Sequence, residues 1–301
     1  MPAAANSSAG FKRLNKWLKR HQDRQVHACL EATGRYGEDL ALQLYGRGHK
    51  VSVVTPLRIK RYAASKLQRN KTDREDAKVI ADFCATQHPL LWTPPAAEVQ
   101  ELQALVRRLG SLIEDRTRET NRLKSGPVSE RVCRSIERHL TFLDEQITAL
   151  ETDIQEHIDH HPELRRQATL LESIPGIGAK TAARLLGEMP DVSLFDSAAQ
   201  LSAYAGLSPR QEQSGTSVHK RSRLAKTGKR ELRTALYMPA LAALRFNPII
   251  QTLVERLAAR GKHKMVIVGA AMRKLLHLAY GVLKTGLPFD PNYAQHSQFA
   301  A

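Results

Sequence analysis

The sequence has few cysteines, and no uninterrupted apolar run in it is long enough to cross a membrane. Its three cysteines, Cys29, Cys84 and Cys133, are widely spaced and odd in number. This usage argues against a disulfide framework and a zinc site, and it is expected of a protein in the reducing cytoplasm. The first residues, Met-Pro-Ala-Ala-Ala-Asn-Ser-Ser, do not have the pattern of a signal peptide, so we predict no membrane partner.

Acidic residues are scarce relative to basic ones. The chain of 301 residues has 46 lysines and arginines against 30 aspartates and glutamates, which gives a net charge of +16 and a pI near 10.0. A basic protein of this size most often binds nucleic acid, and a generic anionic partner is the simpler alternative. Because hydrophobic residues make up 42% of the chain, it is globular and long enough for two domains.

The positive charge lies in two separate regions. Residues 1–95 hold 17 basic and 8 acidic side chains, a net charge of +9, and residues 166–301 hold 19 and 8, a net charge of +11. Residues 96–165 hold 10 and 14, a net charge of −4. We therefore predict two basic domains, at 1–95 and 166–290, separated by a spacer at 96–165 and followed by a tail at 291–301.

The first region alternates between helical and strand patterns. We predict strands at 25–31 and 50–54, and helices at 10–21, 35–47, 56–67 and 72–85. Strands that alternate with helices indicate a parallel α/β sheet. The helix at 10–21 has one apolar and one basic face, and the simplest interpretation is that it packs on the sheet with its basic face in water.

The middle region has the pattern of two long helices. After Pro94-Pro95, apolar residues recur every three or four positions from Val99 to Ile113, and again from Val132 to Ile158. This spacing predicts a helical hairpin or a coiled-coil linker. A pair of buried core helices is the alternative, but the charges and the length favour an exposed stalk that joins copies of the chain into a homo-oligomer. From about residue 168 we predict an all-α C-terminal domain.

Three carboxylates could meet in the first domain. Glu31 ends a predicted strand, and Asp73 and Asp76 lie three residues apart at the start of a predicted helix. Because parallel α/β sheets bind ligands at the carboxyl ends of strands, these acids could hold a divalent metal ion that acts on phosphates. The alternative is structural, since Thr72 and Glu75 have capping-box spacing and acids stabilise a first helical turn. The three acids together favour the metal site.

Two further segments suit nucleic-acid binding. Pro175-Gly176-Ile177-Gly178 resembles a helix-hairpin-helix motif, in which backbone amides approach a phosphate, and a tight turn without a ligand is the alternative. Residues 218–233 hold seven basic side chains and one acid, a density typical of phosphate contact rather than of a solvated face. The candidate nucleic-acid-binding residues are Gly176, Gly178, Lys180, Lys220, Arg221, Arg223, Lys226, Lys229 and Arg230.

A candidate nucleophile precedes the basic segment. Ser214 lies in a basic loop, where it could attack a phosphodiester while nearby cations stabilise the developing charge. A Ser-Gly pair is more often only a turn, and Ser217 and Ser222 fit this role equally well. His219 could act as a base, although a lone histidine more often contacts a phosphate or solvent.

These motifs in this order resemble those of DEDD-type insertion-sequence transposases of the one-hundred-ten family, a group related to the pilin-gene invertase. The similarity extends from about residue 10 to 285, and the combination is highly specific although no single piece is. The matching stretches are Glu31-Ala-Thr-Gly, Val51 to Pro56, Lys71-Thr-Asp-Arg-Glu-Asp-Ala, Ile174-Pro-Gly-Ile-Gly, and Gly206-Leu-Ser-Pro-Arg with Gln213-Ser-Gly.

The resemblance implies an N-terminal RuvC-like (RNase H-like) domain, a coiled-coil linker and a C-terminal transposase domain. It assigns Glu31, Asp73 and Asp76 to a catalytic tetrad that binds Mg²⁺, and Ser214 to a nucleophile that becomes covalently linked to DNA. It also implies a noncoding RNA that guides the choice of DNA partners.

The chain departs from the family pattern at its start. The family tetrad opens with an Asp on a first strand, in a Gly-Ile-Asp-type context, whereas this chain begins just before the helix at Phe11. Asp23 is not a substitute, because it follows a helix. We expect a truncated RuvC-like domain, and either the start codon lies further upstream or the gene is a decayed copy.

We interpret the chain as a DNA transposase that cuts and rejoins DNA with a metal ion and a serine nucleophile. One alternative is a catalytically inactive, truncated copy that only binds DNA or RNA. Another is a RuvC-like junction nuclease, whose cleavage of DNA would not depend on Ser214.

Overall fold

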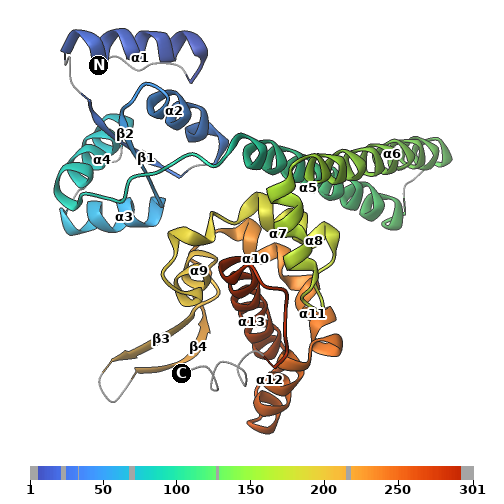
Figure 1. Cartoon of the computed structure of the whole chain (residues 1–301). Helices are drawn as coiled ribbons and strands as arrows, with labels where there is room; N and C mark the ends of the chain where they lie inside the picture. The colour runs from blue at the N-terminus through green and yellow to red at the C-terminus, as the bar shows by residue number, and fades with distance from the viewer. Residues whose placement is uncertain are drawn as a thin grey trace. The chain divides into compact units, whose positions relative to one another are not determined.

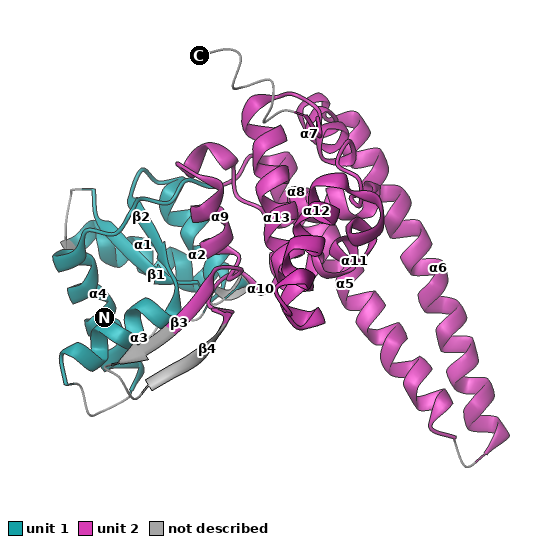
Figure 2. Ribbon diagram, turned by 90° about the horizontal axis from the view of Figure 1, so that it is seen from below, with its two compact units in different colours: residues 1–94 teal, residues 95–301 magenta. Residues whose placement is uncertain are grey.

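The computed structural model divides the chain into two compact units, residues 1–94 and 95–301 (Figure 2). The division falls between Pro94 and Pro95, where the sequence places its first boundary. The structure describes residues 6–21, 25–32, 34–67, 72–126, 129–214 and 218–292, apart from the side chains of His21, Arg35, Tyr36, Glu212–Ser214 and Val218–Ser222.

Unit 1 combines a small parallel sheet with helices, as the sequence predicts. Its strands β1 and β2 are parallel, with His27 opposite Lys50 and Glu31 opposite Val54. Each predicted helix and strand of this region is present within a few residues of its expected bounds. The order is α1 (Ser8–His21), β1 (His27–Glu31), α2 (Arg35–Tyr45), β2 (Lys50–Val54), α3 (Pro56–Ser65) and α4 (Asp73–Gln87).

Helices cover both faces of this sheet. Side chains alternate along a strand, so Ala28 and Leu30 point to one face of β1 while Cys29 points to the other. The first face packs with α1 and α2, in a cluster with Leu14 and Leu44. The second face packs with α3 and α4, in a cluster that holds Cys29, Val54, Ile59, Val79, Ile80 and Phe83. The sheet therefore separates two sides of unit 1.

Unit 2 is mostly helical. In Figure 1 its chain runs from green through yellow to red. Its order is α5 (Ala97–Lys124), α6 (Glu130–His160), α7 (Pro162–Glu172), α8 (Ala179–Glu188), the 3-10 helix η1 (Val192–Leu194), α9 (Ala198–Tyr204), β3 (Pro209–Ser214), β4 (Val218–Leu224), α10 (Arg230–Ala235), α11 (Tyr237–Phe246), α12 (Pro248–Ala259) and α13 (Lys264–Thr285).

Helices α5 and α6 form an antiparallel hairpin. His157 Nε2 lies 2.8 Å from the backbone oxygen of Glu98 at one end, and Arg116 donates to Asp144 further along. The part of the hairpin nearest its turn extends away from the other helices of unit 2 (Figures 1 and 2). The predicted helical hairpin is therefore confirmed, whereas the coiled coil stays a prediction.

The core of unit 2 forms around α13. Leu275, Leu276 and Ala279 of this helix are fully buried, and α7, α9, α11 and α12 pack against it. Among the described residues, α13 is the one helix long and apolar enough to cross a membrane. It is weak evidence for a membrane span, because a buried core helix meets the same criteria of length and composition. Arg273 and Lys274 also interrupt its apolar sequence.

The prediction of an all-α C-terminal domain is wrong, because β3 and β4 form an antiparallel hairpin after α9 (Figure 1). The sequence of this hairpin, from Pro209 to Leu224, is almost entirely polar or charged. A strand is recognised in a sequence when it alternates between apolar and polar residues, which requires one face to be buried. This hairpin lacks that alternation, so its strands leave no period-two signal.

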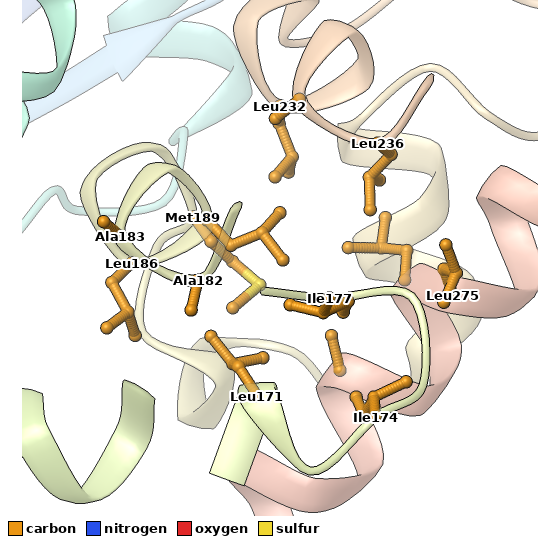
Figure 3. Packing of buried hydrophobic residues seen from close by; sticks show 14 of the residues in the cluster. Leu171, Ile174, Ile177, Ala182, Ala183, Leu186, Met189, Leu232, Leu236 and Leu275 are labelled. Atoms are coloured by element: carbon orange, nitrogen blue, oxygen red, sulfur yellow. The ribbon is translucent and has the colours of Figure 1, made fainter. Parts of the chain in front are cut away.

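The glycine hairpin between α7 and α8 is part of the core. Ile174 and Ile177 lie in one cluster with Leu171 and Leu275 (Figure 3). Gly176 has a φ of 105°, and a Cβ atom there would come within 2.8 Å of the Cβ of Ala243. Packing against α11 thus requires glycine at this position.

We predict that Gly176→Ala lowers the free energy of unfolding by about 2–4 kcal/mol, because it adds backbone strain and a steric overlap. Denaturant titration measures this change. Gly178→Ala is the matched control, since Gly178 has a negative φ and nothing lies within 4 Å of its added Cβ. Equal losses in the two variants would contradict the packing role of Gly176.

Candidate functional site

Glu31 lies at the end of β1, on the side of the sheet that α4 covers. Its side chain alternates with that of Leu30, so it shares a face with Cys29. Cys29 belongs to the cluster that contains Val79 and Ile80 of α4. The first predicted carboxylate and the helix that carries the other two are therefore on one side of unit 1.

The direction of α4 brings Asp76 towards Glu31. The thiol of Cys84 lies 3.9 Å from the backbone oxygen of His27, which places the end of α4 beside the start of β1. Back along α4, Ile80 packs in the same cluster as Cys29, so helix and strand run in opposite directions. From Cys84 to Asp76 the helix rises about 12 Å, and β1 advances about 13 Å from His27 to Glu31. Asp76 thus comes approximately level with Glu31.

The first turn of α4 contains part of the helix cap that the sequence analysis gave as the alternative to a metal site. The hydroxyl of Thr72 accepts a hydrogen bond from the backbone N–H of Glu75 at 3.3 Å, as a helix cap does. Glu75 also pairs with Lys78 at 2.7 Å. Within the described residues, Asp73 and Asp76 form neither an ion pair nor a side-chain hydrogen bond. In this part of the chain, only the backbone N–H of Glu75 and the side chain of Lys78 are therefore seen to use the polar groups of the turn.

The three predicted carboxylates do not form a closed metal site. Among the described residues, no three His, Cys, Asp or Glu side chains lie close enough together to hold a metal ion. The donor set itself suits Mg²⁺, which prefers carboxylate oxygens and water. Glu31, Asp73 and Asp76 thus have the chemistry of a magnesium site without its coordination geometry.

Two thiols on this side of the sheet have raised pKa values. Burial, together with the adjacent Cys84, raises the pKa of the Cys29 thiol to about 11. Burial also raises the pKa of Cys84. Because the thiolate is the form of cysteine that attacks electrophiles and binds metal ions, these shifts disfavour both roles at neutral pH. The carboxylates are thus better candidate metal ligands than the thiols on this side of unit 1.

Ser214, the predicted nucleophile, is the last residue of β3. Its backbone pairs with that of Val218, and the neighbouring Gln213 pairs with His219. The side chains of Ser214, His219 and Ser222 and the whole of Ser217 lie outside the described residues. The backbone alone places Ser214 at the end of β3 that is farthest from the core.

The base of the hairpin is attached closely to the end of α9. The backbone N–H of Lys229 donates to the oxygen of Tyr204 at 2.8 Å, and that of Lys226 donates to Gly206 at 3.1 Å. Gly228 has a φ of 148°, and a Cβ atom there would lie 2.2 Å from the oxygen of Tyr204. The two chain segments can approach this closely only because position 228 is glycine.

A buried carboxylate anchors this base to two other elements. Glu188, at the end of α8, is only 2% exposed. Its Oε1 atom lies 3.2 Å from Nε of Arg107 in α5, and its Oε2 atom lies 2.8 Å from Nζ of Lys229. One buried ion-pair network therefore joins the α5–α6 hairpin, the helix α8 that follows the glycine hairpin, and the base of the β3–β4 hairpin. We refer to the β3–β4 hairpin, which carries Ser214, as the serine hairpin.

This network corrects the assignment of Lys229 to nucleic-acid binding. The Lys229 side chain is only 20% exposed and is paired with Glu188, so it is a structural residue. The sequence of a basic segment does not reveal which of its lysines and arginines lie on the surface and which lie in the interior. The buried partner lies far away in the chain, which explains why the sequence did not separate Lys229 from its neighbours.

Tyr204 does not provide an alternative nucleophile. Burial raises the pKa of its phenol to about 12, and the negative charges of Glu188 and Glu231 act in the same direction. The phenolate is therefore disfavoured at neutral pH. Tyr204 is therefore a poorer candidate nucleophile than the serines of the hairpin.

The other residues predicted to bind nucleic acid differ in their exposure and in their partners within the protein. Arg223, Lys226 and Arg230 are exposed around the base of the hairpin. Lys180 is exposed but pairs with Glu151 at 2.6 Å. Gly176 is explained by packing, whereas Gly178 is exposed at the N-terminus of α8 with open space around it. The side chains of Lys220 and Arg221 lie outside the described residues.

Sequence reasoning missed Glu188 and Arg107. The available signal was Glu188 itself, a single acid after the apolar segment Ala182-Ala183-Arg184-Leu185-Leu186-Gly187. A charged residue in a buried helical segment needs a partner. The sequence does not reveal which of the many basic residues supplies it.

Comparison with known proteins places these elements in a family. A DEDD transposase model matches residues 2–126, and the model of the IS116/IS110/IS902 transposase family matches residues 168–255. Pilin gene-inverting proteins of Moraxella bovis and Moraxella lacunata are each 39% identical over 292 residues, which cover 95% of this chain and 89% of those proteins. The transposase for insertion sequence element IS1111A of Coxiella burnetii is 27% identical, over 66% of this chain and 61% of that protein.

The first matched region covers nearly all of unit 1 together with α5, and the second lies within unit 2. Both are regions of a transposase, a class of enzymes that recombine DNA. The chain belongs to the IS110 family of insertion-sequence transposases. The resemblance inferred from its motifs is thus confirmed.

We predict that Lys229→Met lowers the free energy of unfolding by about 3 kcal/mol, because it leaves the buried Glu188 with one cation instead of two. Denaturant titration of the whole chain measures the loss. Lys226→Met is the matched control, because Lys226 lies on the same segment with an exposed side chain. A similar loss in both variants would show that the pair with Glu188 does not stabilise unit 2.

Proposed function

We propose that this transposase cuts and rejoins DNA by using the carboxylates of unit 1 and the serine of unit 2. The observation that supports the carboxylate part is the antiparallel packing of α4 on β1, which brings Asp76 level with Glu31 on one side of the sheet. Glu31, Asp73 and Asp76 would hold Mg²⁺, which would withdraw charge from a bound phosphate. The other nucleic-acid contacts would come from exposed cations near the serine hairpin.

In the proposed serine step, Oγ of Ser214 attacks the phosphorus of a DNA phosphodiester. A bond forms between Oγ and phosphorus, one bridging P–O bond breaks, and the departing oxygen ends with the proton of the serine hydroxyl. Attack of a DNA hydroxyl on the serine phosphodiester reverses these changes and joins a new strand. Arg223 and Arg230, both exposed at the base of the hairpin, are suited to hold the surrounding phosphates.

We also propose a noncoding RNA partner and self-association through the α5–α6 hairpin. The RNA partner rests on the family resemblance and on the strongly basic composition of the chain. Self-association is supported by two large apolar side chains on the hairpin, Ile113 and Phe142, which are 45% and 52% exposed. Exposed apolar residues on a projecting element are typical of a protein interface.

A second candidate function is nucleic-acid binding without catalysis. The observation that favours it is the absence, within the described parts of the chain, of three assembled metal ligands. This candidate predicts that DNA or RNA binds normally and that magnesium changes nothing. The two experiments below separate the candidates.

We predict that Ser214→Ala abolishes the covalent DNA adduct but leaves DNA binding within about twofold, since a missing hydroxyl removes the nucleophile and little contact area. The adduct is measured on a denaturing gel after incubation with element-end DNA, RNA and magnesium. Ser222→Ala is the control and should retain the adduct. An adduct that persists without Ser214 would contradict the assignment.

We predict that Asp76→Asn removes the stabilisation of unit 1 by Mg²⁺, because a neutral amide is a much weaker ligand than a carboxylate. The shift of the melting temperature with added MgCl₂ measures this effect without any need for catalysis. Glu75→Gln is the matched control, because Glu75 lies in the same helical turn but pairs with Lys78. No magnesium shift in the unaltered chain would favour the non-catalytic candidate.

A further inference from the structure

Helix α1 presents its positive charges on a single face. At 100° per residue, Lys12, Arg13, Lys16, Lys19 and Arg20 fall within an arc of about 120°. All five side chains are exposed, and the helix contains no acidic residue. From the first to the last, the charges extend along about 12 Å of the helix. We refer to these five residues as the cationic face of α1.

No acidic residue that the structure describes neutralises this face. Among the described residues, none of its five cations forms an ion pair, although cations elsewhere on the surface do. On the α5–α6 hairpin, for example, Arg118 pairs with Asp115 at 3.0 Å and Arg122 pairs with Glu119 at 2.6 Å. Like charges four residues apart, such as Lys12 and Lys16, destabilise a helix. The cationic face therefore costs stability in the isolated protein.

The packing of α1 restricts what can bind there. Leu14 and Leu18, on the opposite side of the helix, pack with Ala41, Leu44 and Val51. These apolar residues are therefore unavailable for insertion into a lipid surface, as an amphipathic membrane helix requires. The cationic face itself contains no aromatic or aliphatic residue of the kind that anchors a protein interface. Its chemistry is that of a partner with closely spaced phosphates.

We propose that the cationic face of α1 binds the phosphate backbone of a nucleic acid. This face lies on the side of the sheet to which Ala28 and Leu30 point, whereas Glu31 and α4 lie on the other side. The phosphates held by α1 therefore belong to a different part of the nucleic acid from those at the carboxylates. Unit 1 would engage two nucleic-acid segments, one on each side of its sheet.

The test removes three charges from this face in the full chain, as Lys12→Gln, Lys16→Gln and Lys19→Gln together. The dissociation constant is measured against salt concentration for a short DNA duplex and for single-stranded RNA. We expect at least a tenfold loss of affinity at low salt for one or both, and a salt slope lower by about 2–3, since each phosphate contact contributes about 0.9 on duplex DNA and about 0.7 on a single strand.

The matched control removes three exposed cations from α6, as Arg131→Gln, Arg134→Gln and Arg138→Gln, and has the same net charge. We expect its affinity and salt slope to stay within about twofold of those of the unaltered chain. A third variant, with Lys12→Arg, Lys16→Arg and Lys19→Arg together, keeps the charge and should retain binding. A loss confined to RNA or to DNA assigns the face to that nucleic acid.

Unchanged binding in the glutamine variant, or an equal loss in the α6 control, would overturn the proposal. Circular dichroism of each variant shows whether the fold is kept, and removal of repelling charges from α1 should not weaken it. The measurement is made without magnesium, so it is independent of the carboxylates and of the serine step. A chain without catalytic activity would still give the expected result.

Discussion

The arrangement of unit 2 depends on the buried charge of Glu188. A carboxylate that is only 2% exposed is tolerated because Arg107 and Lys229 approach it from two different elements. Removing either cation leaves part of this charge uncompensated, so α5 and the base of the serine hairpin are held to α8 together. Gly228 completes the junction, because its missing side chain lets this segment contact the backbone of Tyr204. The basic segment 218–233 is thus held at its C-terminal end by the contacts of Gly228 and Lys229.

Two residues that the sequence predicts to bind nucleic acid have a structural role in the fold. Lys229 looks like its basic neighbours, yet it neutralises an interior acid. Gly176 has the sequence context of a phosphate-binding turn, yet the close approach of Ala243 already requires glycine there. Gly178, two residues later, has open space and stays free to approach a ligand. A motif can therefore contain one residue needed for packing beside another that is available for binding.

Local patterning was sufficient to predict the helices and strands of unit 1 and the α5–α6 hairpin, because each of these elements buries one periodic face. It failed for β3 and β4, whose sequence is almost entirely polar and therefore has no buried face to reveal the period of a strand. The sequence indicated Glu31 and Asp76, whereas the direction of α4 along β1 follows only from two contacts in the fold, Cys84 beside His27 and Ile80 in the cluster of Cys29. Glu188 and Arg107 are 81 residues apart in the chain. No local pattern specifies such a pair.

The two interpretations of the first turn of α4 are compatible. Thr72 caps the helix, and the unpaired N–H groups and the dipole of this end favour negative charge. Asp73 and Asp76 repel each other on one face of the turn, and the helix end offsets part of that repulsion while no cation is bound. Approach of Glu31 would add a third negative charge to this region, and a bound cation would offset the added repulsion. The helix cap and the proposed role as metal ligands can therefore apply to the same two aspartates, because the cap uses Thr72 and the backbone N–H of Glu75 and leaves the carboxylates of Asp73 and Asp76 out of the capping bond.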